Sequence, residues 1–325
     1  MIPLKEIERA AEVMKPILHP TPLQYSRTFS RMAGGEVFLK AECLQWCGSH
    51  KIRGAYYMLH KYPPPKRAGG VVSFSSGNWA QGIAHAGALL EVPITVIMPE
   101  DANPAKAAAT KGYGAEVILY GHDSNQLFEK ARVLAQERGA TMVTPLFDRD
   151  MVAGLGTMGL ELITEMPDLT KMIFPLGSGG HIAGAAAAVK QIKPEVELYG
   201  VQPESAAAMV AALEAGQVVP LDSAETMADG LKIKEAHPEA FRLVRELVEG
   251  VVTVPEEAME EAIWLLMDRA KLVVEPSGAI PLAGLLSGQI PVTPQDKVAL
   301  VLTGGNILLT LLAKIVNAKL NPNIS

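Results

Sequence analysis

Cysteine is scarce in this sequence, and this scarcity excludes a fold held together by disulfides. The two cysteines, Cys43 and Cys47, lie in one short segment, so a bond between them would join no distant parts of the chain. Proteins that depend on disulfides belong to oxidising compartments, whereas free cysteines are typical of reducing ones. The sequence therefore predicts a cytoplasmic protein whose stability comes from its hydrophobic core.

Long apolar runs and an excess of basic charge are also missing. No run reaches the roughly 18 apolar residues of a membrane-spanning helix, and residues 1–15 are amphipathic rather than signal-like. The 29 Lys and Arg are outnumbered by 35 Asp and Glu, giving a net charge of -6. We therefore expect no membrane and no nucleic-acid partner, and a small molecule as the ligand.

What the chain does contain is a long alternation of apolar strands and helices. Its 325 residues, 49% of them hydrophobic, are enough for two domains. One series of strands and helices runs from about residue 70, a second begins near residue 171, and the break lies at residues 147–154. Helices are expected at 154–164, 181–191, 205–215 and 256–270. This order predicts an α/β fold with two parallel-sheet lobes and an active-site cleft between them.

Ligands of such sheets bind in loops at the carboxyl ends of strands, and three such loops are rich in small or polar residues. Residues 177–180, Gly-Ser-Gly-Gly, precede a helix and predict a phosphate-binding turn, although an ordinary turn would look similar. Residues 75–78, Ser-Ser-Gly-Asn, open another helix and predict a seat for a carboxylate. Residues 303–306, Thr-Gly-Gly-Asn, end the last strand.

A fourth glycine-rich string, residues 154–159, matches the dinucleotide-binding pattern GxGxxG. A nicotinamide-dependent dehydrogenase would rest on this string alone. The pattern requires a preceding strand, but residues 147–153 carry three charges. We therefore interpret these glycines as positions where a helix packs closely against its neighbours.

Lys51 is the candidate catalytic residue. Gly48 and Ser49 predict a helix N-cap just before it, which places the amine at the positive end of a helix dipole. That position disfavours the ammonium form, and a neutral lysine is what Schiff-base chemistry needs. A single lysine is more often a surface charge, so the inference gains weight only with the loops above.

The cysteines and histidines show no familiar metal-site spacing, and no metal is expected.

The order of these motifs resembles a known family. The segments GSHKIRGA, SSGN, GSGG, EPSGA and GGN follow one another as in the threonine ammonia-lyase (threonine dehydratase) and serine racemase family, and the resemblance runs from His19 to Asn306. These are fold-type-II, tryptophan synthase β-like enzymes that use pyridoxal 5'-phosphate. The resemblance implies a large cofactor-binding domain of residues 1–51 and 149–325 and a small substrate-binding domain of residues 52–148. It also implies a homodimer or homotetramer.

The resemblance also implies a role for each matching residue. Lys51 would carry the cofactor and move the substrate Cα proton, Asn78 would contact the cofactor's phenolic oxygen, and Thr303 would face its pyridine nitrogen. The implied substrate-binding residues are Ser75, Ser76, Gly77, Asn78 and Trp79. The implied cofactor-binding residues are Lys51, His50, Asn78, Gly177, Ser178, Gly179, Gly180, His181, Glu275 and Thr303.

The implied reaction is β-elimination from L-threonine or L-serine, giving 2-oxobutanoate or pyruvate and ammonia. This chain departs from the family pattern at His50, Trp79, Ser178 and His181, so two alternatives stay open. One is β-replacement, because a histidine before the lysine resembles the tryptophan synthase β subunit. The other is serine racemisation, because Ser76 matches the second acid–base residue of racemases, where it would be catalytic alongside Lys51. A binding module without a cofactor is the remaining, non-enzymatic alternative.

Overall fold

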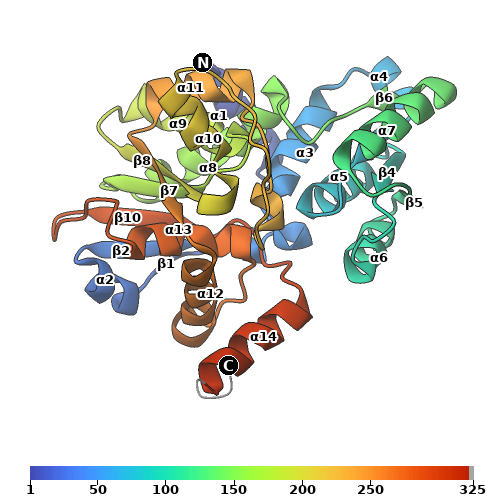
Figure 1. The fold of residues 1–325 in the computed structure, drawn as a ribbon. Coiled ribbons are helices and arrows are strands. Elements are labelled where there is room, and N and C mark those ends of the chain that lie inside the picture. Colours follow the sequence, from blue (N-terminus) through green and yellow to red (C-terminus); the bar gives the residue numbers. More distant parts are fainter. Residues whose placement is uncertain (322–325) are drawn as a thin grey trace.

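Helices and strands alternate along the computed structural model, which describes residues 1–321 (Figure 1). The strands are β1 Leu23–Tyr25, β2 Glu36–Lys40, β3 Val71–Phe74, β4 Ile94–Met98, β5 Glu116–Leu119, β6 Thr141–Met142, β7 Lys171–Pro175, β8 Glu197–Pro203, β9 Gly250–Val254 and β10 Lys297–Val301. The helices are α1 Leu4–Met14, α2 Arg27–Ala33, α3 Lys51–Lys61, α4 Pro64–Ala68, α5 Asn78–Leu89, α6 Pro104–Gly112, α7 Ser124–Arg138, α8 Arg149–Glu165, α9 Gly180–Ile192, α10 Ala208–Ala215, α11 Pro238–Leu247, α12 Glu256–Leu265, α13 Pro276–Leu286 and α14 Leu309–Leu320.

The strands form two separate sheets. The larger has six strands in the order β1-β2-β10-β7-β8-β9, and the smaller has four in the order β5-β4-β3-β6. Every neighbouring pair is parallel except β1 and β2. The smaller sheet uses only the segment from β3 to β6, whereas the larger joins strands from both ends of the sequence. The division into a large domain of residues 1–51 and 149–325 and a small domain of residues 52–148 stays a prediction.

Both faces of the large sheet are covered by helices because its central strands are apolar on both sides. In β10, Val298 and Leu300 join a core cluster that includes residues of α12 and α13. Ala299 and Val301 point the other way, into a cluster that includes residues of α8, α9 and α11. Successive side chains of a strand alternate between faces, so a continuous apolar run fills two cores.

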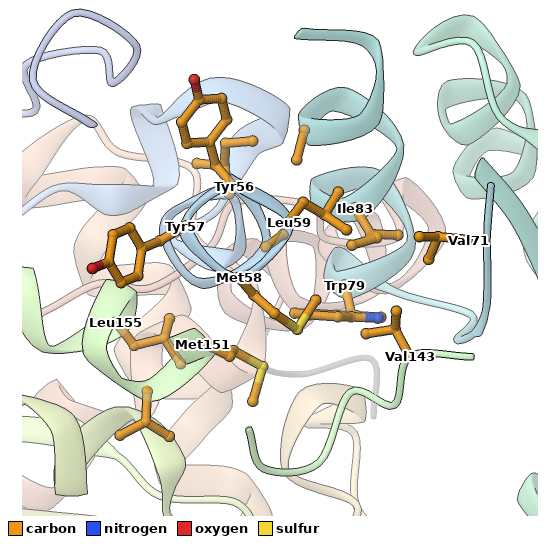
Figure 2. Packing of buried hydrophobic residues seen from close by; sticks show 14 of the residues in the cluster. Tyr56, Tyr57, Met58, Leu59, Val71, Trp79, Ile83, Val143, Met151 and Leu155 are labelled. Atoms are coloured by element: carbon orange, nitrogen blue, oxygen red, sulfur yellow. The ribbon is translucent and has the colours of Figure 1, made fainter. Parts of the chain in front are cut away.

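Helix α3 connects the two sheets. It packs against α5, which follows β3, and against α8, which precedes β7. Figure 2 shows Met58 and Leu59 of α3 among Ile83 and Trp79 of α5, while Tyr57 lies near Leu155 of α8. One apolar cluster therefore runs across the junction, and the first residue of α3 is Lys51.

The GxGxxG string lies inside α8, which begins at Arg149, so no strand leads directly into its first glycine. A Cβ at Gly154 would lie 2.5 Å from the backbone oxygen of Arg53 in α3, and one at Gly156 would lie 2.7 Å from that of Gly184 in α9. These glycines allow three helices to approach one another closely, as the sequence predicted. The structure gives no support to a dinucleotide turn here.

Several helix boundaries differ from the predictions. The helix expected at 205–215 is a short 3₁₀ turn at Glu204–Ala206 followed by α10, and the one expected at 256–270 changes to a π-helix at Leu266–Ala270. The predicted cap at Gly48–Ser49 is also wrong, because α3 has His50 at its N-cap without a side-chain cap hydrogen bond.

Within residues 1–321, no helix is long and apolar enough to cross a membrane.

Candidate active site

Lys51 is held in place by a tight turn that is bonded to the end of β10. The turn residues Cys47 and Gly48 have φ angles of 60° and 64°, in the left-handed region. The backbone N–H of His50 donates to the oxygen of Thr303 at 3.0 Å, and that of Gly305 donates to the oxygen of Gly48 at 2.9 Å. The loop after the last strand thus fixes the start of α3.

The Lys51 amine lies in an environment that favours its neutral form. Burial lowers its pKa, and the nearby Glu275 carboxylate opposes this shift without cancelling it. The helix N-terminus acts in the same direction as burial. A lysine with a lowered pKa can act as a nucleophile and as a base near neutral pH.

A chain of amide and carboxyl groups lies beside Lys51. Asn78, the first residue of α5, donates to Glu275 through Nδ2 and accepts from Nδ2 of Asn306 at 2.8 Å. Asn306 Nδ2 also donates to the oxygen of Cys47 at 2.8 Å. Burial raises the pKa of Glu275, although the Lys106 cation and the Asn78 hydrogen bond oppose the shift. Three loops from both sheet regions are therefore linked by these side chains.

The Ser75–Asn78 loop joins β3 to α5 at the carboxyl end of the strand. Ser75 accepts a hydrogen bond from the N–H of Gly77 at 3.2 Å, while Ser76 is exposed. A Cβ at Gly77 would meet nothing within 4 Å, so the space beside it is open. The loop presents hydroxyl and N–H groups at the start of a helix, an arrangement suited to a carboxylate.

Trp79 does not share this position. Its side chain is 3% exposed, its Nε1 donates to the Ser73 hydroxyl at 2.9 Å, and Figure 2 shows the ring between Met58 and Val143. The sequence assigned this side chain to the substrate-binding set; here it packs into the core, and a contact with the substrate stays a prediction. The ring fills the core beneath the loop, where a tryptophan needs one partner for its N–H.

The Gly177–Gly180 loop leads from β7 into α9. Gly179 has φ +99°, and a Cβ there would lie 2.8 Å from the Met209 side chain, so only glycine fits without strain. Because Gly179 is the N-cap of a 13-residue helix, the unpaired N–H groups of the first turn face outward from this loop. Such a helix end binds anions. The predicted phosphate-binding turn therefore has the required backbone.

Two histidines meet beside Lys51. The rings of His50 and His181 stack with centroids 4.3 Å apart and planes 17° apart. His50 is the N-cap residue of α3 and His181 lies in α9, and both side chains are buried. Within residues 1–321, the buried polar side-chain atoms that lack a hydrogen-bond partner are Ser49 Oγ, His50 Nε2, His181 Nδ1, His181 Nε2 and His237 Nδ1.

A cavity of about 200 Å³ opens beside Glu275. Its polar lining includes Lys106 of α6, Asp229, Ser277 and Asn306. Lys106 Nζ and the Asp229 carboxylate form an ion pair at 3.3 Å that links α6 to the segment before α11. The cavity therefore lies between the two sheet regions, as the predicted cleft should.

Sequence reasoning missed Asn306, His237, Lys106 and Asp229 as neighbours of the site. Asn306 had a signal, since it closes the Thr-Gly-Gly-Asn loop that was singled out. His237 had none: its backbone N–H donates to the Ser178 oxygen at 3.3 Å, a contact made by distant segments.

The predicted residues Lys51, His50, Asn78, His181, Glu275 and Thr303 come together. No group of three or more His, Cys, Asp or Glu suited to a metal occurs within residues 1–321.

Comparison with known proteins gives a consistent result. Residues 14–304 match the family described as pyridoxal-phosphate dependent enzyme. The chain is 39% identical to an L-threonine ammonia-lyase from Thermotoga maritima over 317 residues, covering 98% of this chain and 79% of that protein. The T.th. threonine deaminase has a TM-score of 0.87 at 40% identity, with 94% of this chain and 98% of that chain covered. Maize serine racemase has a TM-score of 0.92 at 30% identity, with 99% of both chains covered. The predicted fold type II is confirmed.

The site also fits the cofactor of this family. Pyridoxal phosphate requires a lysine for its aldehyde and an anion site for its phosphate. Lys51 would provide the first, and the α9 N-terminus, with the unpaired histidine nitrogens beside it, would provide the second. Buried polar atoms without partners are rare in folded proteins, and a bound polar ligand would account for them. The chain belongs to the family of pyridoxal-phosphate-dependent enzymes.

Proposed function

We propose that this enzyme removes water and then ammonia from L-threonine or L-serine, giving 2-oxobutanoate or pyruvate. The observation that carries the proposal is a lysine of lowered pKa at the start of α3, together with the glycine-rich loop at the N-terminus of α9 and the Ser75–Asn78 loop at the N-terminus of α5. The names of two relatives, L-threonine ammonia-lyase and threonine deaminase, support this reaction.

Each residue of the site has a role in this proposal. When bound, pyridoxal phosphate withdraws electrons from the substrate Cα and so acidifies its proton. The Ser75–Asn78 loop holds the substrate carboxylate, and the α9 N-terminus holds the cofactor phosphate. Lys51 Nζ removes the Cα proton, because burial has left its amine with a lowered pKa. The β-hydroxyl then leaves, and hydrolysis of the remaining enamine releases ammonia and the keto acid.

Lys51→Ala tests this proposal. We expect keto acid formation from L-threonine and L-serine to fall by at least roughly 10²- to 10⁴-fold, the usual contribution of a positioned general base. Keto acid and ammonia should be measured in the same sample, together with the visible absorption of the cofactor. His122→Gln, at a histidine that is 68% exposed, is the matched control and should retain wild-type rates. Unchanged activity in Lys51→Ala would refute the assignment.

The products distinguish β-elimination from the two alternatives. Serine racemisation is favoured by the likeness to maize serine racemase, and it would give D-serine without ammonia. β-Replacement would consume an added nucleophile such as indole or sulfide and give a new amino acid. The proposal requires keto acid and ammonia in equal amounts, with L-serine recovered as the L form.

We also propose that the enzyme is a cytoplasmic homodimer or homotetramer. Cys43 and Cys47 are both buried and unpaired within the described residues, as expected in a reducing compartment. Apolar side chains such as Leu309, which is 77% exposed, lie at the start of α14 at the periphery of the molecule (Figure 1). Sedimentation analysis of the purified enzyme tests the oligomeric state, and a monomer at all concentrations would contradict it.

A further inference from the structure

The stacked pair of His50 and His181 has more hydrogen-bonding capacity than the protein uses. The two side chains are 6% and 8% exposed. Among residues 1–321, Nε2 of His50 and both ring nitrogens of His181 find no partner. His181 lies in the first turn of α9, directly after the Gly177–Gly180 loop. The unused nitrogens therefore lie beside the N-terminus of α9.

The tautomer of His50 follows from its one hydrogen bond. Its Nδ1 lies 3.1 Å from the backbone oxygen of Thr303. A carbonyl oxygen can only accept, so Nδ1 carries the hydrogen. In a neutral imidazole the other nitrogen, Nε2, then has a lone pair and no hydrogen. As it stands, Nε2 can accept a hydrogen bond but cannot donate one to an anion.

The charged groups around the pair are mainly cationic. Lys51 and Arg53 of α3 lie nearest, and Arg53 is itself paired with Glu42 and Glu161. The Glu275 carboxylate acts on Lys51. Burial, the second imidazole and these cations hold the pKa of His50 well below its usual value, and burial with Lys51 and Arg53 does the same for His181. Without an anion the pair is therefore neutral.

A phosphate dianion at the α9 N-terminus would raise the lowered pKa values of these two histidines. Its charge favours a proton on a neighbouring imidazole, and a protonated His50 can donate from Nε2 while Nδ1 keeps its bond to Thr303. A proton placed instead on a phosphate oxygen would be donated to the Nε2 lone pair. Both arrangements add one solvent proton to the complex and satisfy the buried nitrogen.

We propose that His50 and His181 complete the phosphate site begun by the Gly177–Gly180 loop, and that one proton enters this pair when the phosphate binds. The proposal depends on the cofactor of the family and holds whichever reaction follows. Failure of the lyase assay would leave it intact, because its readout is binding.

Proton uptake can be counted by calorimetry. The full-length, cofactor-free enzyme is titrated at pH 8 with pyridoxal phosphate and with pyridoxal, which lacks the phosphate, in two buffers of different ionisation enthalpy. The reaction of Lys51 with the aldehyde is common to both ligands and cancels in their difference. We expect pyridoxal phosphate to take up one proton more than pyridoxal. Equal uptake by both ligands would overturn the proposal.

Variants assign the proton to the pair. His50→Asn keeps an N–H for the Thr303 oxygen but removes Nε2, and His181→Asn removes the stacked partner. We expect roughly tenfold to hundredfold weaker binding of pyridoxal phosphate, the usual effect of losing one hydrogen bond to a charged group, and loss of the extra proton in His50→Asn. Pyridoxal affinity should stay within about twofold, which is below 0.5 kcal/mol.

His122→Gln is the matched control, because this histidine is exposed and lies outside the stacked pair. Equal losses for both ligands would indicate a purely structural role for the histidines and would refute the proposal. If a variant fails to fold, the proton count of the wild-type enzyme still decides the question.

Discussion

Two features of Glu275 act on its pKa in opposite directions. The side chain is buried at the centre of the site, which raises the pKa, and it accepts a hydrogen bond from Asn78, which lowers the pKa. Its carboxyl oxygen would lie 2.2 Å from a Cβ at Gly304, which shows how closely the last loop approaches it. A buried carboxylate costs free energy when ionised. The raised pKa of Glu275 expresses that cost.

Glu275→Gln should stabilise the cofactor-free protein at neutral pH. The folded pKa of Glu275 lies above the unfolded value of 4.5. Between these two pKa values the folded protein keeps a proton on Glu275 that the unfolded chain has lost. The folded state therefore loses stability as the pH rises from 4.5 through the folded pKa. Each unit of the shift corresponds to about 1.4 kcal/mol at high pH. Urea unfolding at pH 4.5 and pH 8 should show the gain at pH 8 only. A gain of equal size at both values would contradict this explanation.

The positions of site residues that depend on local backbone structure were predictable from the sequence. Lys51, the Gly177–Gly180 loop and the Ser75–Asn78 loop each stand at a strand end or helix start, where spacing and residue type suffice. The stacking of His50 on His181 was not predictable, because it depends on how α3 and α9 are placed. The position of the Trp79 ring was not predictable for the same reason: its neighbours in the sequence lie in the loop, whereas its ring packs in the core.

Among the elements, α8 depends most on its glycines. Its contacts with α3 and α9 bring backbone against backbone, and a Cβ at Gly184 of α9 would lie 2.4 Å from the oxygen of Val152 in α8. Helix propensity alone favours alanine over glycine by about 1 kcal/mol. At these positions the lack of space outweighs propensity, since a helix backbone cannot move as a side chain does.

Gly156→Ala should therefore destabilise the protein by roughly 1–3 kcal/mol, the usual cost of overpacking. Gly112→Ala is the matched control, because Gly112 also lies in a helix and a Cβ there would meet nothing within 4 Å. The control should be neutral or more stable. Thermal unfolding of both variants gives the comparison, and equal stability of Gly156→Ala and wild type would show that α8 can shift.

At the scale of the whole molecule, a buried ion cluster ties the N-terminal strands to the helices that carry the site. Arg53 donates to both carboxylate oxygens of Glu42 at 2.8 Å and to Glu161 at 2.8 Å, and Lys40 pairs with Glu161 at 2.5 Å. Burial opposes ionisation of Glu42, but Arg53 and the hydrogen bonds outweigh it, so the pKa of Glu42 is lowered. Arg53 lies two residues beyond Lys51 in the same helix, so this cluster also anchors α3.

Glu42→Gln should cost roughly 3–5 kcal/mol at pH 7, because it removes one of the two carboxylates that balance the buried Arg53 charge and leaves only Glu161, which Lys40 shares. The lowered pKa of Glu42 contributes stability that is present above the unfolded value of 4.5 and is lost as the pH falls through the folded pKa. The variant should therefore lose less stability than wild type below pH 4.5, measured by urea unfolding. Glu129→Gln breaks an exposed pair with Arg132 and should cost at most about 1 kcal/mol. A loss of that size for Glu42→Gln would argue against the cluster.

The order of strands in the large sheet has a consequence for how the chain is made. Strand β2 pairs along its length with β10, so Glu36 cannot pair until Lys297 has been synthesised. The small sheet needs only β3 to β6, which leave the ribosome as one continuous stretch. During synthesis the small sheet can therefore form first, while β1 and β2 expose an unpaired edge until β10 has been synthesised. A nascent chain stalled before β10 should need chaperone protection at its N-terminal end.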